Sequence, residues 1–116
     1  MTETEIASAA TGDFPIDSLK FDENGLIPAI VQHMDTKEVL MLGFMNEEAL
    51  AETQRTREAV FFSRSRNKLW KKGESSGRLL KVREVRVDCD SDTLLLRVQP
   101  MGPGVCHEGF RSCFFR

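Results

Sequence analysis

The chain has 116 residues, 41% of them hydrophobic and 29% charged, and a formal net charge of −2. These values are typical of one globular domain, and no segment approaches the ~20 apolar residues of a membrane span. The first thirteen residues lack the basic start and apolar run of a signal peptide, and three cysteines are an odd number for a disulfide scaffold. We therefore expect a cytoplasmic protein with reduced thiols and no membrane partner.

The charges are unevenly distributed along the chain. Residues 1–54 contain 2 Lys or Arg and 11 Asp or Glu residues, a net charge of −9, whereas residues 55–86 contain 11 and 3, a net charge of +8. Such segregation creates a local positive potential. Because the pI is about 5.7, below that of typical nucleic-acid-binding domains, we expect a compact anionic ligand and no nucleic acid.

The first part of the chain predicts a tail, a hairpin and a buried strand. Residues 1–14 are polar and predict a mobile N-terminal tail before a single domain of residues 15–116. The turn formers Asn24–Gly25 separate two apolar stretches and predict a β-hairpin, with Pro28 at a strand start or a sheet edge. The apolar run of residues 38–45 predicts a buried strand.

The remainder predicts one helix and then strands. Asn46 followed by two glutamates is typical of a helix N-terminus, and the helix is expected over residues 46–56. Strands are expected in residues 59–65, 68–72, 78–90, 93–99 and 110–116; the alternation of apolar residues in the third breaks step between Val82 and Val85. The expected fold class is mainly β, a β-rich α+β fold with one main helix.

Three carboxylates alternate with other residues at the end of the third of these strands. If residues 85–90 are extended, Asp88 and Asp90 share one face and Cys89 projects from the other, with Asp92 joining the carboxylates where the turn permits. Oxygen ligands suit Mg²⁺ and a thiolate suits Zn²⁺, so one strand can divide two metals between its faces. The alternative is a solvated acidic turn with a buried cysteine.

The C-terminal part supplies further metal ligands. Cys106, His107 and Cys113 follow Cys89 in the sequence, and the intervals of seventeen and seven between the cysteines are not zinc-finger spacings. Three thiolates leave a tetrahedral zinc ion with one open position for water, as in catalytic sites. Where the first and last cysteines cannot reach each other within one subunit, a dimer partner completes the set. His107 either moves protons or is a hydrogen-bonded structural residue.

The basic stretch of residues 63–77, SRSRNKLWKKGESSG, is a plausible phosphate-binding segment. Arginine offers paired hydrogen bonds to phosphate, lysine offers a point charge, and the loop between Gly73 and Gly77 offers backbone N–H groups. The alternative is a solvated basic strand in which Trp70 anchors the core.

Together these segments resemble the phosphoribosyl-AMP cyclohydrolase family, from about residue 21 to residue 116. The resemblance is carried, in this order, by GLIPAIVQ, VLMLGFMNEEAL, FFSRSRNKLWKKGESSG, VDCDSD and CHEGFRSCFF. It implies a homodimeric, β-rich pseudobarrel of short strands capped by the helix. It also implies zinc held across the dimer interface and magnesium held by carboxylates; the implied ligands are Cys89, Cys106 and Cys113 for zinc, and Asp88, Asp90 and Asp92 for magnesium.

The resemblance further implies hydrolysis of the N1–C6 bond in the adenine ring of phosphoribosyl-AMP, a step of histidine biosynthesis. Zinc would lower the pKa of its water toward ~7, and the resulting hydroxide would attack C6. His107 is the candidate for proton transfer. The two phosphates of the substrate account for the basic stretch, with Arg64, Arg66, Lys71 and Lys72 as candidate contacts.

Some positions depart from the usual family pattern. Phe61 and Phe62 stand where Tyr-Trp is common, and Ser75 stands where threonine is common. Glu108 and Phe110 replace threonine and arginine beside the expected metal site, so we assign no substrate contact to them. The alternative function is a non-catalytic zinc-stapled β-module that binds nucleic acid or a protein partner; the charge segregation favours it, and the missing finger spacing opposes it.

Overall fold

The computed structural model describes residues 16–74, 76–102 and 111–116. The tail predicted for residues 1–14 lies outside these residues, as do Ser75, Cys106, His107, Glu108 and Phe110. Within the described part of the chain, no helix is long and apolar enough to cross a membrane.

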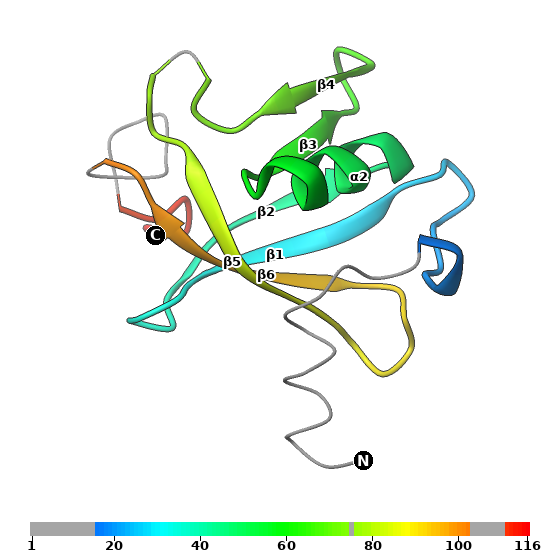
Figure 1. Cartoon of the computed structure of the whole chain (residues 1–116), viewed down its shortest axis with the longest axis horizontal. Coiled ribbons are helices and arrows are strands. Elements are labelled where there is room, and N and C mark those ends of the chain that lie inside the picture. The colour runs from blue at the N-terminus through cyan, green and yellow to red at the C-terminus, as the bar shows by residue number, and fades with distance from the viewer. Residues whose placement is uncertain (1–15, 75, 103–110) are drawn as a thin grey trace.

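A four-stranded sheet forms the larger layer (Figure 1). Its strands are β1 (Ile27–His33), β2 (Val39–Met45), β5 (Leu80–Val87) and β6 (Leu94–Pro100), in the order β2-β1-β6-β5. The central strands β1 and β6 are parallel, and each pairs antiparallel with its outer neighbour. Pro28 is the second residue of β1 and precedes the first residue paired with β6, so it lies at the strand start, one of the two positions predicted for it.

The smaller layer lies above this sheet in Figure 1. It contains the α-helix α2 (Glu47–Thr56) and a two-stranded antiparallel sheet of β3 (Val60–Ser63) and β4 (Lys68–Lys71); a short 3₁₀-helix, η1 (Ile16–Ser18), precedes β1. The side chain of Asn46 accepts a hydrogen bond from the Ala49 N–H at 2.8 Å, which confirms the predicted helix start. The β-rich α+β class predicted from the sequence is also confirmed.

Alternate residues of the central strands build the core between the two layers. Ala29 and Val31 of β1 and Leu94, Leu96 and Val98 of β6 are fully buried, as period-two alternation predicts. Phe61 of β3 covers them from the other layer with no exposed surface. The break in alternation along β5 corresponds to a β-bulge, where the pairing register shifts between residues 82 and 84.

An isolated bridge joins the segment before β3 to β5 of the larger sheet. Glu58, just before β3, pairs with Lys81 of β5, and the Ala59 N–H donates to the Leu80 carbonyl at 3.0 Å. On the other side, β3 contacts β2. The strands thus curve around one core without forming a continuous ring of ladders. This geometry brings the basic stretch of β3 and β4 next to β5.

Two sequence predictions about local structure are wrong. Between residues 16 and 24 the structure has no strand, because the Asp22 carboxylate accepts from the Asn24 and Leu26 N–H groups and closes a loop instead of a hairpin. Residues 111–116 of the predicted last strand also form no strand. There the Ser112 hydroxyl donates to the Val39 carbonyl at 2.8 Å and accepts from the Phe114 N–H at 2.9 Å, replacing ladder hydrogen bonds.

Candidate active site

The acidic stretch after β5 is a turn and not a strand. The Ser91 N–H donates to the Asp88 carbonyl at 3.0 Å, and Ser91 has φ +63°. The Asp88 carboxylate accepts from the Asp92 N–H at 3.0 Å and the Thr93 N–H at 3.3 Å, so its side chain closes the turn. The prediction that extended geometry places Cys89 opposite the carboxylates is therefore wrong.

This turn gathers the three carboxylates more closely than a strand would. Asp88, Asp90 and Asp92 are exposed, and one oxygen from each lies within 4.8 Å of the others, so together they can hold a metal ion. A hydrogen bond shared with Asp88, desolvation and repulsion from both neighbours raise the pKa of Asp92. For Asp88, hydrogen bonds from Asp92 and Thr93 outweigh desolvation and lower the pKa. A cation between the three side chains would relieve their mutual repulsion.

The two described cysteines are exposed and lie in separate parts of the molecule. Cys89 lies in the acidic turn, with its sulfur 3.9 Å from the Asp90 carboxylate. Cys113 lies in the C-terminal segment, where its N–H donates to the Leu40 carbonyl of β2 at 2.7 Å. In Figure 1 the β5–β6 turn and the C-terminal segment are at opposite sides of the molecule. One chain therefore does not bring these two cysteines together.

Just before this hydrogen bond, the C-terminal segment is also held to β2 and to Glu38, the residue that precedes β2. The Arg111 guanidinium lies 2.6 Å from a Glu38 carboxylate oxygen, and its hydrogen bond holds the pKa of Glu38 below its ordinary value. Ser112 is buried, although its neighbours are exposed. The backbone at Cys113 is thus held in place on the sheet edge.

Two adjoining pockets lie over β3 and β4. The first, of about 480 Å³, is called the basic pocket here and is lined by Ser63, Ser65, Arg66, Trp70, Lys71, Gly73, Glu74 and Ser76. The second, of about 570 Å³, is called the aromatic pocket and is lined by Gly43, Phe44, Phe61, Phe62, Arg64, Ser65 and Trp70. Because they share Ser65 and Trp70, the two pockets adjoin each other, and together they are called the hollow here.

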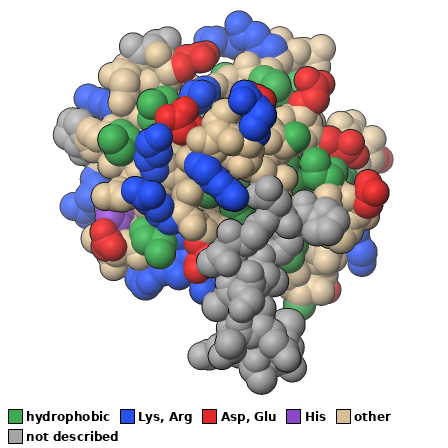
Figure 2. Space-filling view, in the orientation of Figure 1, with side chains coloured by type: hydrophobic (Ala, Val, Ile, Leu, Met, Phe, Trp, Pro, Cys, Tyr) green, Lys and Arg blue, Asp and Glu red, His purple; other side chains and the backbone are tan. Residues whose placement is uncertain are grey.

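Three of the four predicted phosphate contacts line this hollow, and Lys72 is not among the lining residues. Arg66 and Lys71 line the basic pocket, and Arg64 lines the aromatic pocket with its guanidinium 4.2 Å from the centre of the Phe44 ring. The Lys72 ammonium lies 5.8 Å from the centre of the Trp70 ring. Figure 2 shows Lys and Arg side chains gathered over β5 and over the top of the molecule, where β3 and β4 lie.

Trp70 is more than an anchor of the core. Its ring packs on the buried Phe61 at 5.3 Å between centroids, yet the residue is only half-buried and lines both pockets. It therefore offers an aromatic surface between two groups of cations, which is suitable for a planar ring that carries anionic groups.

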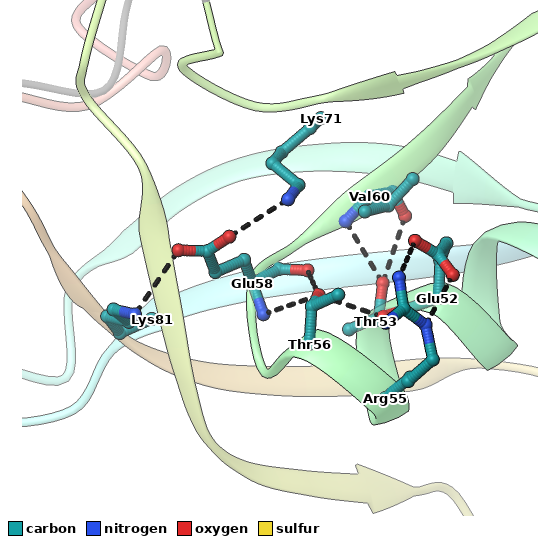
Figure 3. A network of polar contacts seen from close by, with 8 residues as sticks. All are labelled: Glu52, Thr53, Arg55, Thr56, Glu58, Val60, Lys71 and Lys81. Carbon is teal, nitrogen blue, oxygen red and sulfur yellow. Dashed lines mark hydrogen bonds and ion pairs between the residues drawn. The ribbon is translucent and has the colours of Figure 1, made fainter.

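Sequence reasoning missed the carboxylate behind the basic pocket. Glu58 bridges two lysines: the Lys71 ammonium lies 2.9 Å from one of its oxygens and the Lys81 ammonium 3.2 Å from the other (Figure 3). Hydrogen bonds from Lys71 and then Lys81 lower the pKa of Glu58. One signal was present in the sequence: Glu58 is the only acidic residue between residues 55 and 73.

A β-rich domain with cation-lined pockets around an aromatic side chain is of the class of proteins suited to bind small anionic molecules. The family model described as phosphoribosyl-AMP cyclohydrolase matches residues 41–115. Such a match covers most of the chain, and this protein belongs to the phosphoribosyl-AMP cyclohydrolase family.

Curated relatives agree over a longer part of the chain. The phosphoribosyl-AMP cyclohydrolase of Caulobacter sp. (strain K31) is 59% identical over 98 residues, which cover 84% of this chain and 73% of the relative. That of Methanosarcina acetivorans is 57% identical, covering 87% and 82% of the two chains. That of Erythrobacter litoralis is 51% identical, covering 97% and 90%. The family is one of enzymes, which decides against the alternative of a non-catalytic module.

Proposed function

We propose that this protein hydrolyses the N1–C6 bond of the adenine ring of 1-(5-phosphoribosyl)-AMP, in histidine biosynthesis in the cytoplasm. The product is the phosphoribosyl-formimino-aminoimidazole-carboxamide ribotide. Membership of the family carries the proposal. The arrangement of the hollow supports it, because a planar ring with a phosphate-bearing group at each end matches an aromatic side chain between two sets of cations.

The chain's own residues bind the substrate and move protons. We propose that Arg66 and Lys71, which line the basic pocket, bind one phosphate, and that Arg64 of the aromatic pocket and Lys72, near the Trp70 ring, bind the other. Water adds to C6 to form a tetrahedral carbon, the N1–C6 bond breaks, and N1 takes up a proton. We assign to His107 the transfer of protons from water to N1 and to the exocyclic nitrogen.

Two metal ions fit the donor atoms of the chain. Cys89, Cys106 and Cys113 would hold zinc, because thiolates are the ligands that zinc prefers and both described cysteines are exposed. Zinc, when bound, supplies the Lewis acidity that activates water at neutral pH. The carboxylates of the acidic turn would hold Mg²⁺, a cation that prefers oxygen ligands.

The protein is proposed to be a homodimer. Four of the five exposed large hydrophobic side chains in the described residues lie on β2 or on the C-terminal segment bound to it: Val39, Leu42, Phe114 and Phe115. A monomer rarely leaves such a group uncovered. A dimer would also bring the acidic turn of one subunit to the C-terminal segment of its partner, as the separation of Cys89 and Cys113 requires.

Metal analysis coupled to an assay of adenine-ring opening tests the function. We expect zinc-loaded protein to convert phosphoribosyl-AMP, and Cys106→Ala to abolish turnover while its circular dichroism spectrum stays unchanged. His107→Ala should retain zinc but lower kcat by about 10²-fold or more. Zinc-loaded protein that leaves this substrate unchanged would refute the proposal, and full kcat in His107→Ala would remove the assigned proton transfer.

The acidic turn provides a separate test for magnesium. We expect Mg²⁺ to raise the Tm of the wild-type protein, because an ion that binds only the folded state stabilises it. Asp90→Asn should lose this rise without lowering the Tm in EDTA, since no backbone hydrogen bond to the Asp90 carboxylate holds the turn. Asp88→Ala should lower the Tm even in EDTA, because Asp88 also closes the turn. An unchanged Mg²⁺ response in Asp90→Asn would contradict the assigned ligand set.

A further inference from the structure

The carboxylate of Glu58 lies between the basic pocket and a second group of cations. Lys71 lines the basic pocket, whereas Lys81 lines a different pocket with Arg57 and Arg83. Both ammonium groups contact the same carboxylate, and Figure 3 shows it between β5 and the lysine of β4. Glu58 therefore fixes the Lys71 side chain from behind the pocket without lining it.

Glu58 is itself held firmly. Its side chain is only 17% exposed. Its backbone pairs with Lys81 of β5, and its N–H donates to the Thr56 hydroxyl at 3.2 Å, at the end of α2. The neighbouring Thr53 hydroxyl joins the same helix to β3 through the Val60 N–H at 3.0 Å. The backbone of Glu58 is thus held between α2, β3 and β5, and Lys81 holds the carboxylate in addition to Lys71.

Lysine at a phosphate site normally loses much side-chain freedom when the ligand binds. A long flexible stem with four rotatable bonds makes that loss large, and holding the ammonium in place beforehand removes part of it. One N–H of Lys71 suffices for the Glu58 contact, which leaves two donors for a ligand. The Glu58 carboxylate partly neutralises the positive charge of Lys71. Because Lys81 contacts the same carboxylate, this loss of positive charge is limited.

We infer that Glu58 is a positioning residue for substrate binding: it holds the Lys71 ammonium at the wall of the basic pocket, where Lys71 and Arg66 together receive a phosphate group. The inference rests on the proposed function, since it takes the basic pocket as the site of one substrate phosphate. Glu74 is the one carboxylate among the described residues that line this pocket, and Glu58 lies behind the lining. Because Arg66 and Lys71 outnumber Glu74, the described lining keeps a net positive charge.

The inference predicts a change in binding without a change in chemistry. We expect Glu58→Gln to raise KM about tenfold with kcat within about twofold, because an interaction made equally in the ground and transition states affects only KM. Glu58→Asp keeps the charge and should recover part of the loss. In a Lys71→Met background, Glu58→Gln should change KM no further, because the two residues act as one unit.

Two control variants separate positioning from general effects of charge. Glu52→Gln removes the same charge from the exposed pair with Arg55 on α2, and its KM should stay within about twofold of wild type. Arg83→Gln removes a cation from the pocket that Lys81 lines, where Arg83 bonds Gln99 and not Glu58, and it should likewise preserve KM. Tm measurements on every variant show whether each remains folded.

A binding measurement makes the test independent of metal and turnover. Trp70 is the only tryptophan of the chain and lines the basic pocket, so its fluorescence should report binding of ribose 5-phosphate. The dissociation constant should rise about tenfold in Glu58→Gln, in parallel with KM. No binding by the wild-type protein would overturn the inference, because the pocket would then not receive phosphate.

The possible results distinguish the inference from the function on which it rests. If Lys71→Met weakens binding and Glu58→Gln does not, Glu58 is no positioning residue, although the proposed function stands. If the increases in KM caused by Glu58→Gln and by Lys71→Met multiply in the double variant, Glu58 does not act through Lys71 and the inference fails. If wild-type protein binds ribose 5-phosphate but opens no adenine ring, the proposed function fails while the Glu58–Lys71 coupling is still decided by fluorescence.

Discussion

Gly73→Ala is expected to raise KM for phosphoribosyl-AMP at least tenfold, because the substitution breaks the wall of the basic pocket. Gly73 has φ +85°, and a Cβ atom there would lie 2.2 Å from the backbone carbonyl of Arg78. Backbone atoms cannot swing away as the end of a flexible side chain can. The loop closed by the 2.7 Å hydrogen bond from the Gly77 N–H to the Gly73 carbonyl would therefore open, displacing the pocket residues that it carries.

Gly77→Ala is the matched control for this prediction. Gly77 has nearly the same backbone angle, φ +79°, but a Cβ atom there would meet nothing within 4 Å. Both variants carry the ~1–2 kcal/mol strain of an alanine in the left-handed region, whereas only Gly73→Ala adds the clash. We expect Gly77→Ala to lower the Tm by a few degrees with KM nearly unchanged. Equal KM values in Gly73→Ala and Gly77→Ala would contradict the prediction that a clash at Gly73 displaces residues of the basic pocket.

Local signals in the sequence were sufficient for the regular elements. The helix was predictable because Asn46 caps it with a single side-chain hydrogen bond to a residue three positions away. The central strands were predictable because their alternate residues, such as Ala29 and Val31, are buried on one face. Even the bulge in β5 was visible as a break in alternation between Val82 and Val85.

The errors arose where a polar side chain competes with backbone pairing. Asp22 and Asp88 each accept two backbone N–H groups and form a turn, where the sequence favoured a hairpin in one case and an extended segment in the other. Ser112 similarly takes a carbonyl of β2. These residues are compatible with either outcome, and packing against distant segments decides between them, so a single sequence does not determine the result.

The candidate site was predictable in its residues but not in its connections. The carboxylates of the acidic turn lie within five residues, and the basic stretch is continuous, so their types and spacing were visible in the sequence. Glu58 was missed because its partners lie 13 and 23 positions away, on strands whose pairing depends on the whole fold. The positions of Cys106 and His107 lie outside the described residues, and their roles stay predictions.

The second large expected effect is on activity, and it rests on the proposal that two subunits share each zinc site. It follows from the separation of the acidic turn from the C-terminal segment within one chain. Cys89→Ala and Cys113→Ala should each be inactive alone, because each removes one ligand from every site of the homodimer. A heterodimer of the two variants contains one site that lacks both ligands and one that lacks neither. Refolding an equal mixture should therefore restore about a quarter of wild-type activity, since half of randomly formed C₂ dimers are mixed.

The control is a pair of variants whose missing zinc ligands would come from the same subunit. Cys106→Ala and Cys113→Ala should not complement each other where both ligands come from one subunit, because every site in their heterodimer then lacks a ligand. Native mass spectrometry verifies that mixed dimers form, and zinc analysis should show metal returning only in the Cys89→Ala and Cys113→Ala mixture. If mixed dimers form there and neither zinc nor activity returns, the ligands belong to one subunit, and the fold must bring the two cysteines together by a rearrangement of the C-terminal segment.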